Sequence, residues 1–485
     1  MTGALEDKVF KDISFINDIK SMAVIGPSER RNFFFLRNHQ ENFKGDLYAV
    51  HPSIKKIPGF DDGTEGKIYE SVKDIPNEID FVFIAVPKSE IIKVIDDCVQ
   101  KGVKLATVFT AEFSDSGTDE GRKLEMKLIE HANNKLRILG PNGMGIYYPK
   151  LGITWRTKFP IESGNIGFIA QSGGICNIAI YTAKEYGINF SKVFSFGNGA
   201  DLDFVDLLYF LGNDPETELI LCYLEGINKN RAKDLKKILE YIQKPIVILK
   251  GGKSNKGKIA AKTHTASISG NNRIWTSLFQ QYNLIEVESL EQLLNIARII
   301  DFYGINNIEN IAVFSISGGY GVVLVDMIEN KSMNIPDFSP EIQEKLKKEF
   351  FVHGTSPKNP LDVAAQLTFS DSVKKIIDIA LKDKKMDALI MDFPSWYFSY
   401  KFFINPDPNY EKNVIDALSL GKVHNKPLFP IIQPTSTPEE QIRISRILAT
   451  KKVPVFRDPL ELIPLLPKIS DYLKKKRKRD KKSVI

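Results

Sequence analysis

The sequence predicts an α/β protein that contains several doubly wound parallel sheets. Short apolar runs alternate with helix-like patterns along most of the chain, which is typical of parallel strands that helices cover on both faces. Two of these runs end in the same Ser-Gly-Gly turn, at residues 172–174 and 317–319, which are 145 residues apart. A chain of 485 residues has room for about three domains of roughly 150 residues each.

Residues 1–150 are predicted to form the first domain. Helical patterns such as residues 89–101 separate its strands, in an order that resembles a Rossmann-type nucleotide-binding domain. Five apolar runs predict the strands, at residues 21–26, 46–50, 81–86, 105–109 and 137–140.

The first strand–helix turn is Gly26-Pro27-Ser28-Glu29-Arg30-Arg31-Asn32. It has only the first glycine of the G-x-G-x-x-G pattern that binds dinucleotides, which argues against a nicotinamide-dependent dehydrogenase. Arg30 and Arg31 could hold phosphates through charge-assisted hydrogen bonds, and an ordinary surface turn is the alternative.

Residues 151–305 and 306–470 repeat the alternation and are predicted to form two further domains. Their shared Ser-Gly-Gly turns suggest a duplication, although glycine after a parallel strand is common enough for coincidence. The predicted strands lie at residues 166–170, 192–195, 219–223 and 246–249, and at residues 311–315, 388–391, 427–432 and 453–456. Residues 471–485 form a basic tail that is expected to be disordered.

Composition excludes several classes of protein. The net charge is +6, but residues 474–482 alone carry eight Lys or Arg and one Asp, so nucleic-acid binding by the folded body is not expected. The three cysteines lack C-x-x-C spacing and are expected to be reduced and buried. No apolar stretch reaches 18 residues and no signal peptide is evident, so we expect a cytoplasmic protein without a membrane segment.

The two Ser-Gly-Gly turns are candidate anion sites. Each lies where a buried strand gives way to a helix, so backbone N–H groups and the positive end of the helix dipole point at one spot above the sheet. Small residues there allow a ligand to approach the backbone closely. Tight packing of the helix on the sheet is the alternative explanation of either turn alone.

His264 and Glu225 are the candidate catalytic residues. His264 lies among small residues in a segment, 262–270, that is expected to be a flexible loop. The other histidines are scattered, so no metal site is expected, and the remaining chemical role is a nucleophile towards phosphorus. Glu225 follows a predicted buried strand and could orient an imidazole. An ordinary histidine and a solvent-directed strand-end charge are the alternatives.

These residues together resemble the NDP-forming acyl-CoA synthetase superfamily, which includes succinyl-CoA synthetase and the ADP-forming acetyl-CoA synthetases. The resemblance runs nearly from end to end. Its motifs are Gly140-Pro141-Asn142, Gln171-Ser172-Gly173-Gly174, the run from Phe196 to Asp203, Tyr223-Leu224-Glu225-Gly226-Ile227, Lys250-Gly251-Gly252, Thr263-His264-Thr265 and Ser317-Gly318-Gly319-Tyr320-Gly321.

The resemblance implies a Rossmann-type CoA-binding domain followed by two flavodoxin-like ligase domains. It implies that His264 is transiently phosphorylated and that Glu225 orients it. Phosphate would be held by Ser172, Gly173, Gly174, Ser317, Gly318 and Gly319. The implied CoA-binding residues are Gly26, Ser28, Arg30, Pro52, Lys55, Val86, Pro87 and Asn142.

The implied function is that of an α-type subunit of an ADP-forming acyl-CoA synthetase. This enzyme interconverts acyl-CoA, ADP and phosphate with a carboxylic acid, CoA and ATP, through an acyl phosphate and a phosphohistidine. Because no stretch fits an ATP-grasp domain, ADP or ATP and Mg²⁺ are expected to bind a β-type partner in a hetero-oligomer. The alternative is a non-catalytic acyl-CoA-binding or regulatory protein.

Three departures from the family pattern bear on these expectations. The first turn lacks the family's later glycines, Gly143 stands where cysteine is usual, and Lys253 stands where many members have arginine. The acyl group, the choice of ADP or GDP and the oligomeric state cannot be inferred from the sequence.

Overall fold

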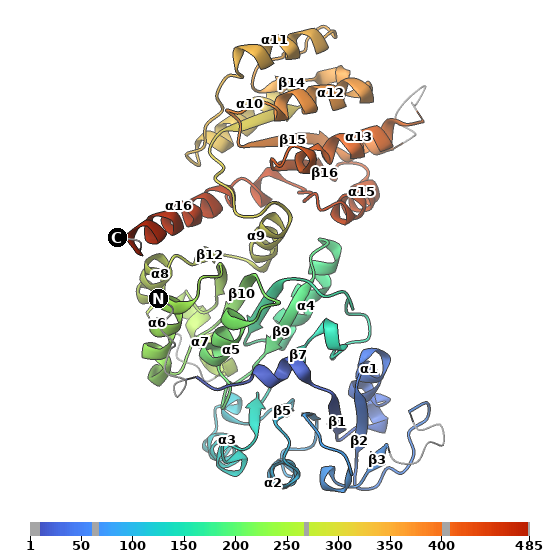
Figure 1. Ribbon diagram of the computed structural model, residues 1–485, viewed down its shortest axis with the longest axis vertical. Coiled ribbons are helices and arrows are strands. Elements are labelled where there is room, and N and C mark those ends of the chain that lie inside the picture. Colours follow the sequence, from blue (N-terminus) through green and yellow to red (C-terminus); the bar gives the residue numbers. More distant parts are fainter. Residues whose placement is uncertain (1–9, 61–66, 266–270, 400–407, 484–485) are drawn as a thin grey trace. The chain divides into compact units, whose positions relative to one another are not determined.

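The computed structural model describes residues 10–60, 67–265, 271–399 and 408–483 (Figure 1). The chain divides into two compact units. Unit 1 comprises Met1–Thr182 and Asn189–Glu288, and unit 2 comprises Ala183–Ile188 and Ser289–Ile485. Unit 1 holds two six-stranded sheets, and unit 2 holds a four-stranded sheet. The predicted α/β class with several parallel sheets is therefore confirmed.

The first sheet of unit 1 is parallel throughout and has the strand order β3-β2-β1-β4-β5-β6. This is the strand order of a Rossmann domain, in which ligands bind where the order reverses, here between β1 and β4. The strands are β1 (Ser21–Ile25), β2 (Asp46–Val50), β3 (Ile68–Tyr69), β4 (Phe81–Ile84), β5 (Leu105–Val108) and β6 (Arg137–Leu139), and the helices are α1 (Phe34–Asn42), α2 (Ile91–Lys101) and α3 (Asp119–Ala132).

The second sheet of unit 1 has the order β12-β11-β10-β8-β9-β7. Without β7, which pairs antiparallel with β9, this is the flavodoxin-like order, and it reverses between β8 and β10. Its strands are β7 (Gly145–Tyr147), β8 (Ile166–Ala170), β9 (Phe190–Ser195), β10 (Leu219–Leu224), β11 (Ile246–Lys250) and β12 (Ile285–Val287), and the helices are α4 (Gly173–Glu185), α5 (Phe204–Asn213), α6 (Ala232–Tyr241), α7 (Asn255–Thr265) and α8 (Asn272–Gln281).

The sheet of unit 2 has the order β14-β13-β15-β16, again with a reversal next to its first strand. The strand expected at residues 453–456 is reduced to one bridge between Phe456 and Ile431, since Pro454 has no N–H to donate to a ladder. The strands are β13 (Ile311–Ser315), β14 (Leu361–Asp362), β15 (Ala388–Pro394) and β16 (Leu428–Gln433), and the helices are α9 (Leu290–Tyr303), α10 (Gly318–Glu329), α11 (Pro340–Glu349), α12 (Ser370–Leu381), α13 (Tyr410–Leu418), α14 (Leu420–Val423), α15 (Pro438–Thr450) and α16 (Leu466–Ser483).

Two segment boundaries differ from the expected ones. Strand β7 precedes residue 150 but pairs within the second sheet, because its partner β9 lies far along the chain and no local pattern indicates that contact. Helix α9 precedes residue 305 but belongs to unit 2, which resumes at Ser289.

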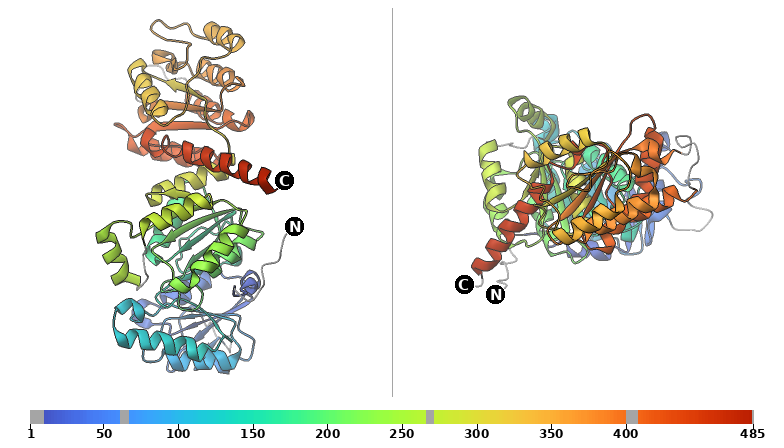
Figure 2. Two further views of the ribbon diagram at one scale, coloured as in Figure 1. Left: turned by 90° about the vertical axis from the view of Figure 1, so that its left-hand side faces the viewer. Right: turned by 90° about the horizontal axis from the view of Figure 1, so that it is seen from above.

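The basic tail is helical where disorder was expected. Helix α16 ends the chain in Figures 1 and 2 and continues to Ser483. Its first turns are anchored by buried Ile469 and Tyr472, and Lys474 pairs with Glu309 at 2.5 Å. Lysine and arginine are good helix formers, so an anchored helix can extend through the basic run.

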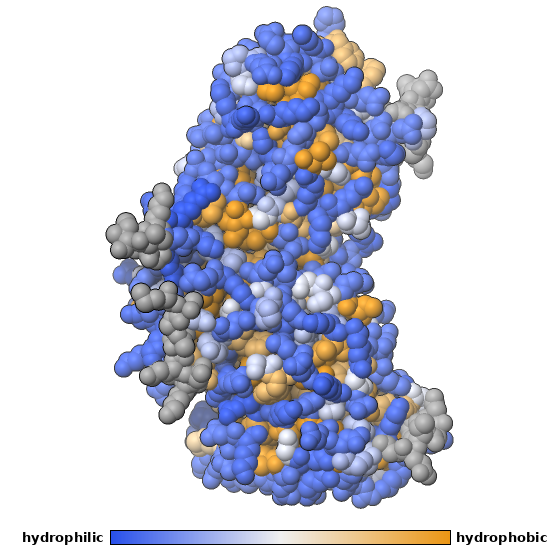
Figure 3. All heavy atoms as spheres, viewed as in Figure 1, coloured by the Kyte–Doolittle hydropathy of each residue, from blue (hydrophilic) through white to orange (hydrophobic). Residues whose placement is uncertain are grey.

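Hydrophilic residues predominate on the face shown in Figure 3, and hydrophobic ones form small separate patches. Among the described helices, none combines the length and the apolarity needed to cross a bilayer. The three cysteines are unpaired and buried, as expected.

A buried ion cluster lies inside unit 1. Lys192 on β9 has no exposed side-chain surface, and its Nζ contacts Asp214 Oδ2 at 2.9 Å and Glu216 Oε2 at 2.7 Å. The ring of Tyr148 lies 4.3 Å from the same Nζ. Removal of one partner from such a cluster leaves an uncompensated charge in the core.

Lys192→Met is expected to lower the free energy of unfolding of unit 1 by about 3–5 kcal/mol, because Asp214 loses its cation. Urea unfolding measures the effect. The double variant Lys192→Met/Asp214→Asn should recover part of the loss. An exposed pair of unit 1 gives the matched control, since Lys236→Ala should cost no more than about 1 kcal/mol. If Lys192→Met lowered the free energy of unfolding by no more than the exposed control does, the prediction would be wrong.

His39 on α1 is a second unusual buried group. Its side chain is 1% exposed, and neither ring nitrogen has a hydrogen-bond partner within the described residues. Burial lowers the pKa of His39 to about 3. The folded protein therefore holds this imidazole in its neutral form at pH 7.

Acidification is expected to destabilise unit 1 through His39. Below its ordinary pKa of 6.5 the unfolded chain binds a proton at His39 that the folded chain does not, so stability falls as the pH falls towards 3. Between pH 6.5 and about pH 4 the loss should be about 3 kcal/mol larger in the wild type than in His39→Leu. Unfolding curves over this range check the slope, and parallel curves for the two proteins would contradict the prediction.

Candidate functional site

Glu225 lies where the order of the second sheet reverses. Strand β10 ends at Leu224, and the next residue, Glu225, is 6% exposed. The Tyr223 hydroxyl donates to Glu225 Oε1 at 3.1 Å, and the ammonium of buried Lys250 donates to the Glu225 carbonyl at 2.6 Å. Burial lowers the pKa of Lys250 to about 8. The carboxyl group of Glu225 is therefore held in place. This arrangement does not fit the alternative, in which the Glu225 charge points into solvent.

The first Ser-Gly-Gly turn begins helix α4 beside Glu225. Strand β8 ends at Ala170, and the Ser172 hydroxyl accepts the N–H of Ile175 at 3.3 Å. Gly173 and Gly174, the first two helical residues, keep N–H groups that cannot be satisfied within the helix. A Cβ on Gly173 would lie 2.4 Å from Met144 Cγ, so a larger residue would require the Met144 side chain to shift.

A cavity of about 230 Å³ opens at this turn. Its floor is the start of α4, and its walls come from both sheets of unit 1. It is lined by Phe109, Asn142, Gly143, Met144, Gln171, Ser172, Gly173, Gly174, Asn177 and Gly197. A Cβ on Gly143 would lie 2.7 Å from the Ser195 carbonyl oxygen, so a cysteine at this position would require the chain to move.

The eight predicted CoA-binding residues lie together around a larger cavity of about 1300 Å³, between the carboxyl ends of β1 and β4. At Gly26, φ is +85° and a Cβ would lie 2.8 Å from the Ala85 carbonyl oxygen, so only glycine fits this turn. The residues are Gly26, Ser28, Arg30, Pro52, Lys55, Val86, Pro87 and Asn142.

The lining of this cavity carries both charges, with six cationic side chains that can bind phosphates and the carboxylates of Glu29, Glu70, Asp74, Glu90 and Asp97. Lys55 and Lys73 in the lining form ion pairs with Glu70 and Asp97. Sequence reasoning missed Lys56 and Lys93, because single lysines in a turn and a helix have no distinguishing pattern. The cationic side chains of the lining are Arg30, Arg31, Lys55, Lys56, Lys73 and Lys93.

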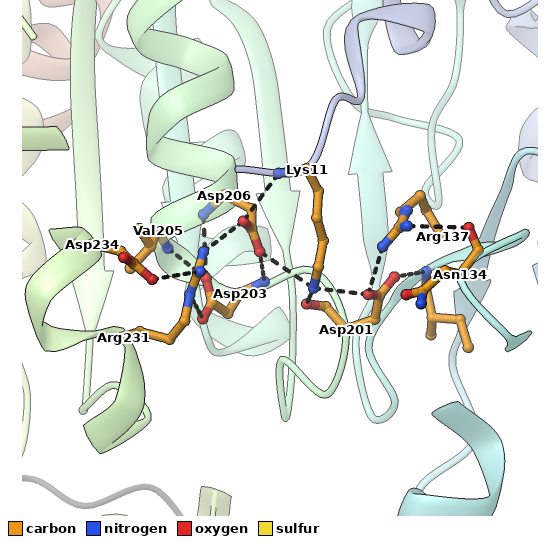
Figure 4. A network of polar contacts seen from close by, with 10 residues as sticks. Lys11, Asn134, Arg137, Asp201, Asp203, Val205, Asp206, Arg231 and Asp234 are labelled. Carbon is orange, nitrogen blue, oxygen red and sulfur yellow. Dashed lines mark hydrogen bonds and ion pairs between the residues drawn. The ribbon is translucent and has the colours of Figure 1, made fainter. Parts of the chain in front are cut away.

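The two cavities adjoin within unit 1. Phe109 and Asn142 line both of them, so the larger cavity lies next to the cavity at the Ser-Gly-Gly turn. A network shown in Figure 4 ties the two sheets together: Asp201, which follows β9, accepts hydrogen bonds from Arg137 at 3.1 Å and from the Ile138 N–H at 2.8 Å, both on β6. Lys11 pairs with Asp201 at 2.8 Å.

His264 lies in the last turn of helix α7, where a loop was expected. The preceding Ala260, Ala261 and Lys262 favour a helix, which explains the difference. The Ser254 hydroxyl accepts the Gly257 N–H at 3.0 Å in the first turn of the helix, and α7 packs against the short helix Ser114–Ser116 of the same unit. The side chain of His264 and residues 266–270 lie outside the described part of the chain.

The second Ser-Gly-Gly turn begins α10 in unit 2 and has more acidic surroundings than the first. Ser315 at the end of β13 is in register with Asp362 and Asp392 on the neighbouring strands. At the first turn, Ala170 at the end of β8 is in register with Ser195 and Tyr223, which are uncharged. A Cβ on Gly318 would lie 2.6 Å from Asp362 Oδ2.

Asp392 is part of these acidic surroundings. It accepts a hydrogen bond from Gln433 at 2.6 Å, and burial raises its pKa to about 7. The two Ser-Gly-Gly turns lie in different units of the chain, so it stays a prediction that both hold the same phosphate group.

Comparison with known proteins gives the family. Residues 20–149 match a family described as "CoA binding domain", and residues 163–300 match "Succinyl-CoA ligase like flavodoxin domain". The α subunit of acetate–CoA ligase (ADP-forming) II of Pyrococcus furiosus is 32% identical over 76% of this chain and 80% of its own length.

Other similar proteins extend over more of the chain. Acetate–CoA ligase (ADP-forming) I of Archaeoglobus fulgidus is 30% identical over 94% of this chain, which spans 63% of the length of that relative. Acetyl-coenzyme A synthetase 1 of Ca. Korarchaeum cryptofilum, solved with phosphate and ADP, has a TM-score of 0.81 at 28% identity and covers 96% of this chain and 98% of its own. The chain belongs to the NDP-forming acyl-CoA synthetase superfamily, as a relative of the ADP-forming acetate–CoA ligases.

Proposed function

We propose that this chain is the α-type subunit of an ADP-forming acyl-CoA synthetase. The observation that carries the proposal is that Phe109 and Asn142 line both cavities, which are therefore neighbours. When bound, CoA supplies the thiol that carries the acyl group as a thioester. A thiol that reaches past Asn142 would lie beside the start of α4, where N–H groups can hold phosphate and stabilise charge during acyl transfer.

His264 is proposed to accept the phosphoryl group, with Glu225 accepting the imidazole N–H so that the other ring nitrogen can attack. The anchored, buried carboxyl of Glu225 supports an orienting role, since an orienting group has to be rigid. Ser172, Gly173 and Gly174 are proposed to hold the phosphoryl group during this transfer, and Ser317, Gly318 and Gly319 to assist from unit 2.

A β-type subunit with an ATP-grasp domain is proposed to bind ADP or ATP and Mg²⁺. The names of two relatives support this, because each is called the α subunit of an ADP-forming ligase. The complete enzyme would then be a hetero-oligomer that acts on a small carboxylic acid in the cytoplasm.

The test is to incubate the purified chain with radiolabelled phosphate and a panel of acyl-CoAs, and to measure acid-labile, base-stable label on the protein. Label that appears with one acyl-CoA would support the half-reaction and identify the acyl group. CoA binding by calorimetry without label, with or without an added β-type subunit, would instead support the non-catalytic acyl-CoA-binding alternative.

A further inference from the structure

The side-chain amide of Gln171 is oriented by its protein contacts. Gln171 follows β8 and is 4% exposed. Its Oε1 accepts the backbone N–H groups of Glu225 at 2.5 Å and of Gly226 at 3.1 Å. A backbone N–H can only donate, so the oxygen has to face these two residues, and the NH₂ group points away from them. In the described residues this NH₂ group has no hydrogen-bond acceptor.

Asn177, one helical turn beyond the start of α4, is oriented in the same way. Its Oδ1 accepts the indole N–H of Trp155 at 2.7 Å. Trp155 is fully buried, and an indole nitrogen can only donate, so the NH₂ group of Asn177 is again the free end. It too has no acceptor within the described residues. Two buried or half-buried amides thus have their oxygens engaged and their donors available.

Both amides line the 230 Å³ cavity at the start of α4, where Gly173 and Gly174 also offer N–H groups. Every side chain in the lining is uncharged, so neither a fixed cation nor a carboxylate determines which ligand enters. A cavity whose polar side chains include two amides without a protein acceptor, beside free backbone N–H groups, favours a ligand rich in acceptors. A tetrahedral oxyanion has acceptors on all sides and is the ligand that helix N-termini bind.

We propose that Gln171 Nε2 and Asn177 Nδ2 are phosphate-binding donors that complete the site at the start of α4. Their part in catalysis rests on the proposed function, whereas the binding of phosphate does not. Gln171 has a second consequence, because the same side chain holds the backbone of Glu225. It therefore links the position of the phosphoryl group to that of the orienting carboxyl group.

The test replaces each amide by its isosteric acid, Gln171→Glu and Asn177→Asp. Each acid keeps one oxygen for the existing contact with Gly226 or Trp155, and replaces the free NH₂ group by an oxygen that repels phosphate. The KM for phosphate in the acyl-CoA half-reaction should rise about 10- to 100-fold, which corresponds to the loss of one hydrogen bond to a charged group. The KM for acyl-CoA should stay within about twofold, since neither residue lines the larger cavity.

Gln243→Glu is the matched control, because it makes the same amide-to-acid change at an exposed position of unit 1 and should leave both constants unchanged. Thermal unfolding establishes that each variant is folded. If Asn177→Asp is not folded, Asn177→Leu replaces it in the test, because leucine removes the donor without adding charge. A folded set of variants with the phosphate KM of the wild type would overturn the proposal.

A binding measurement separates this proposal from the proposed function. Calorimetry with inorganic phosphate alone should show binding to the wild type and weaker binding to both acid variants. If the wild type binds phosphate in this way but never transfers it, the proposed function fails and the site stands. If the wild type transfers phosphate and the variants match it in binding and KM, the site fails and the function stands. If the KM for acetyl phosphate in the reverse half-reaction also rises, the two donors bind the phosphoryl group that both substrates share. If only the KM for inorganic phosphate rises, the donors bind the free anion.

Discussion

Replacement of His264 by asparagine is expected to abolish the acid-labile phosphorylation of this chain by acyl-CoA and phosphate. An amide nitrogen is not a nucleophile towards phosphorus, whereas a neutral imidazole is. The variant should fold as the wild type does, because the substitution falls in the last turn of α7. Radiolabel incorporation measures the loss, and thermal unfolding measures the fold.

The matched control is His353→Asn, which changes an exposed histidine of unit 2 and should leave the label intact. Acid-labile label that persists in His264→Asn would place the phosphoryl group on another residue. Loss of label in both variants would show that the change to asparagine acts through folding or handling rather than through the nucleophile.

Glu225→Gln is expected to slow phosphorylation of the protein by roughly 10²–10⁴, the usual range for loss of an acid–base or orienting partner. The contacts of Glu225 indicate that this substitution changes the charge of the side chain without disturbing its surroundings. Glutamine keeps an oxygen that can accept from the Tyr223 hydroxyl, and the backbone contacts of Gln171 and Lys250 do not involve the changed group. The variant therefore removes the negative charge and leaves the shape of the site.

The rate of this variant should be measured in single-turnover experiments with saturating acyl-CoA and phosphate. Glu218→Gln, at an exposed position close in sequence, should retain the wild-type rate. If Glu225→Gln also retained it, Glu225 would be a structural residue whose burial serves the strand end alone.

The sequence predicts most of the fold because its strands are short, buried and parallel. Residues 46–50, 166–170 and 311–315 are strands in the structure with the predicted bounds, since each is a largely apolar run that is buried over most of its length. Strands β3, β7, β12 and β14 were missed, because each has only two or three residues, too few for a local pattern to show. The helical tail was missed because a run of basic residues reads locally as a solvated end.

Some features of the candidate site could be predicted from the sequence, and others depend on the tertiary structure. The sequence by itself places the Ser-Gly-Gly turn at 172–174 and Glu225 at a strand end, because turn chemistry and strand periodicity are local. The eight CoA-binding residues follow from the family resemblance and stay a prediction. Only the tertiary structure shows that Asn142 lines both cavities and that Gln171 and Asn177 line the smaller one. The direction in which an amide points depends on what its oxygen contacts, and those contacts come from Gly226 and Trp155, which only folding brings near.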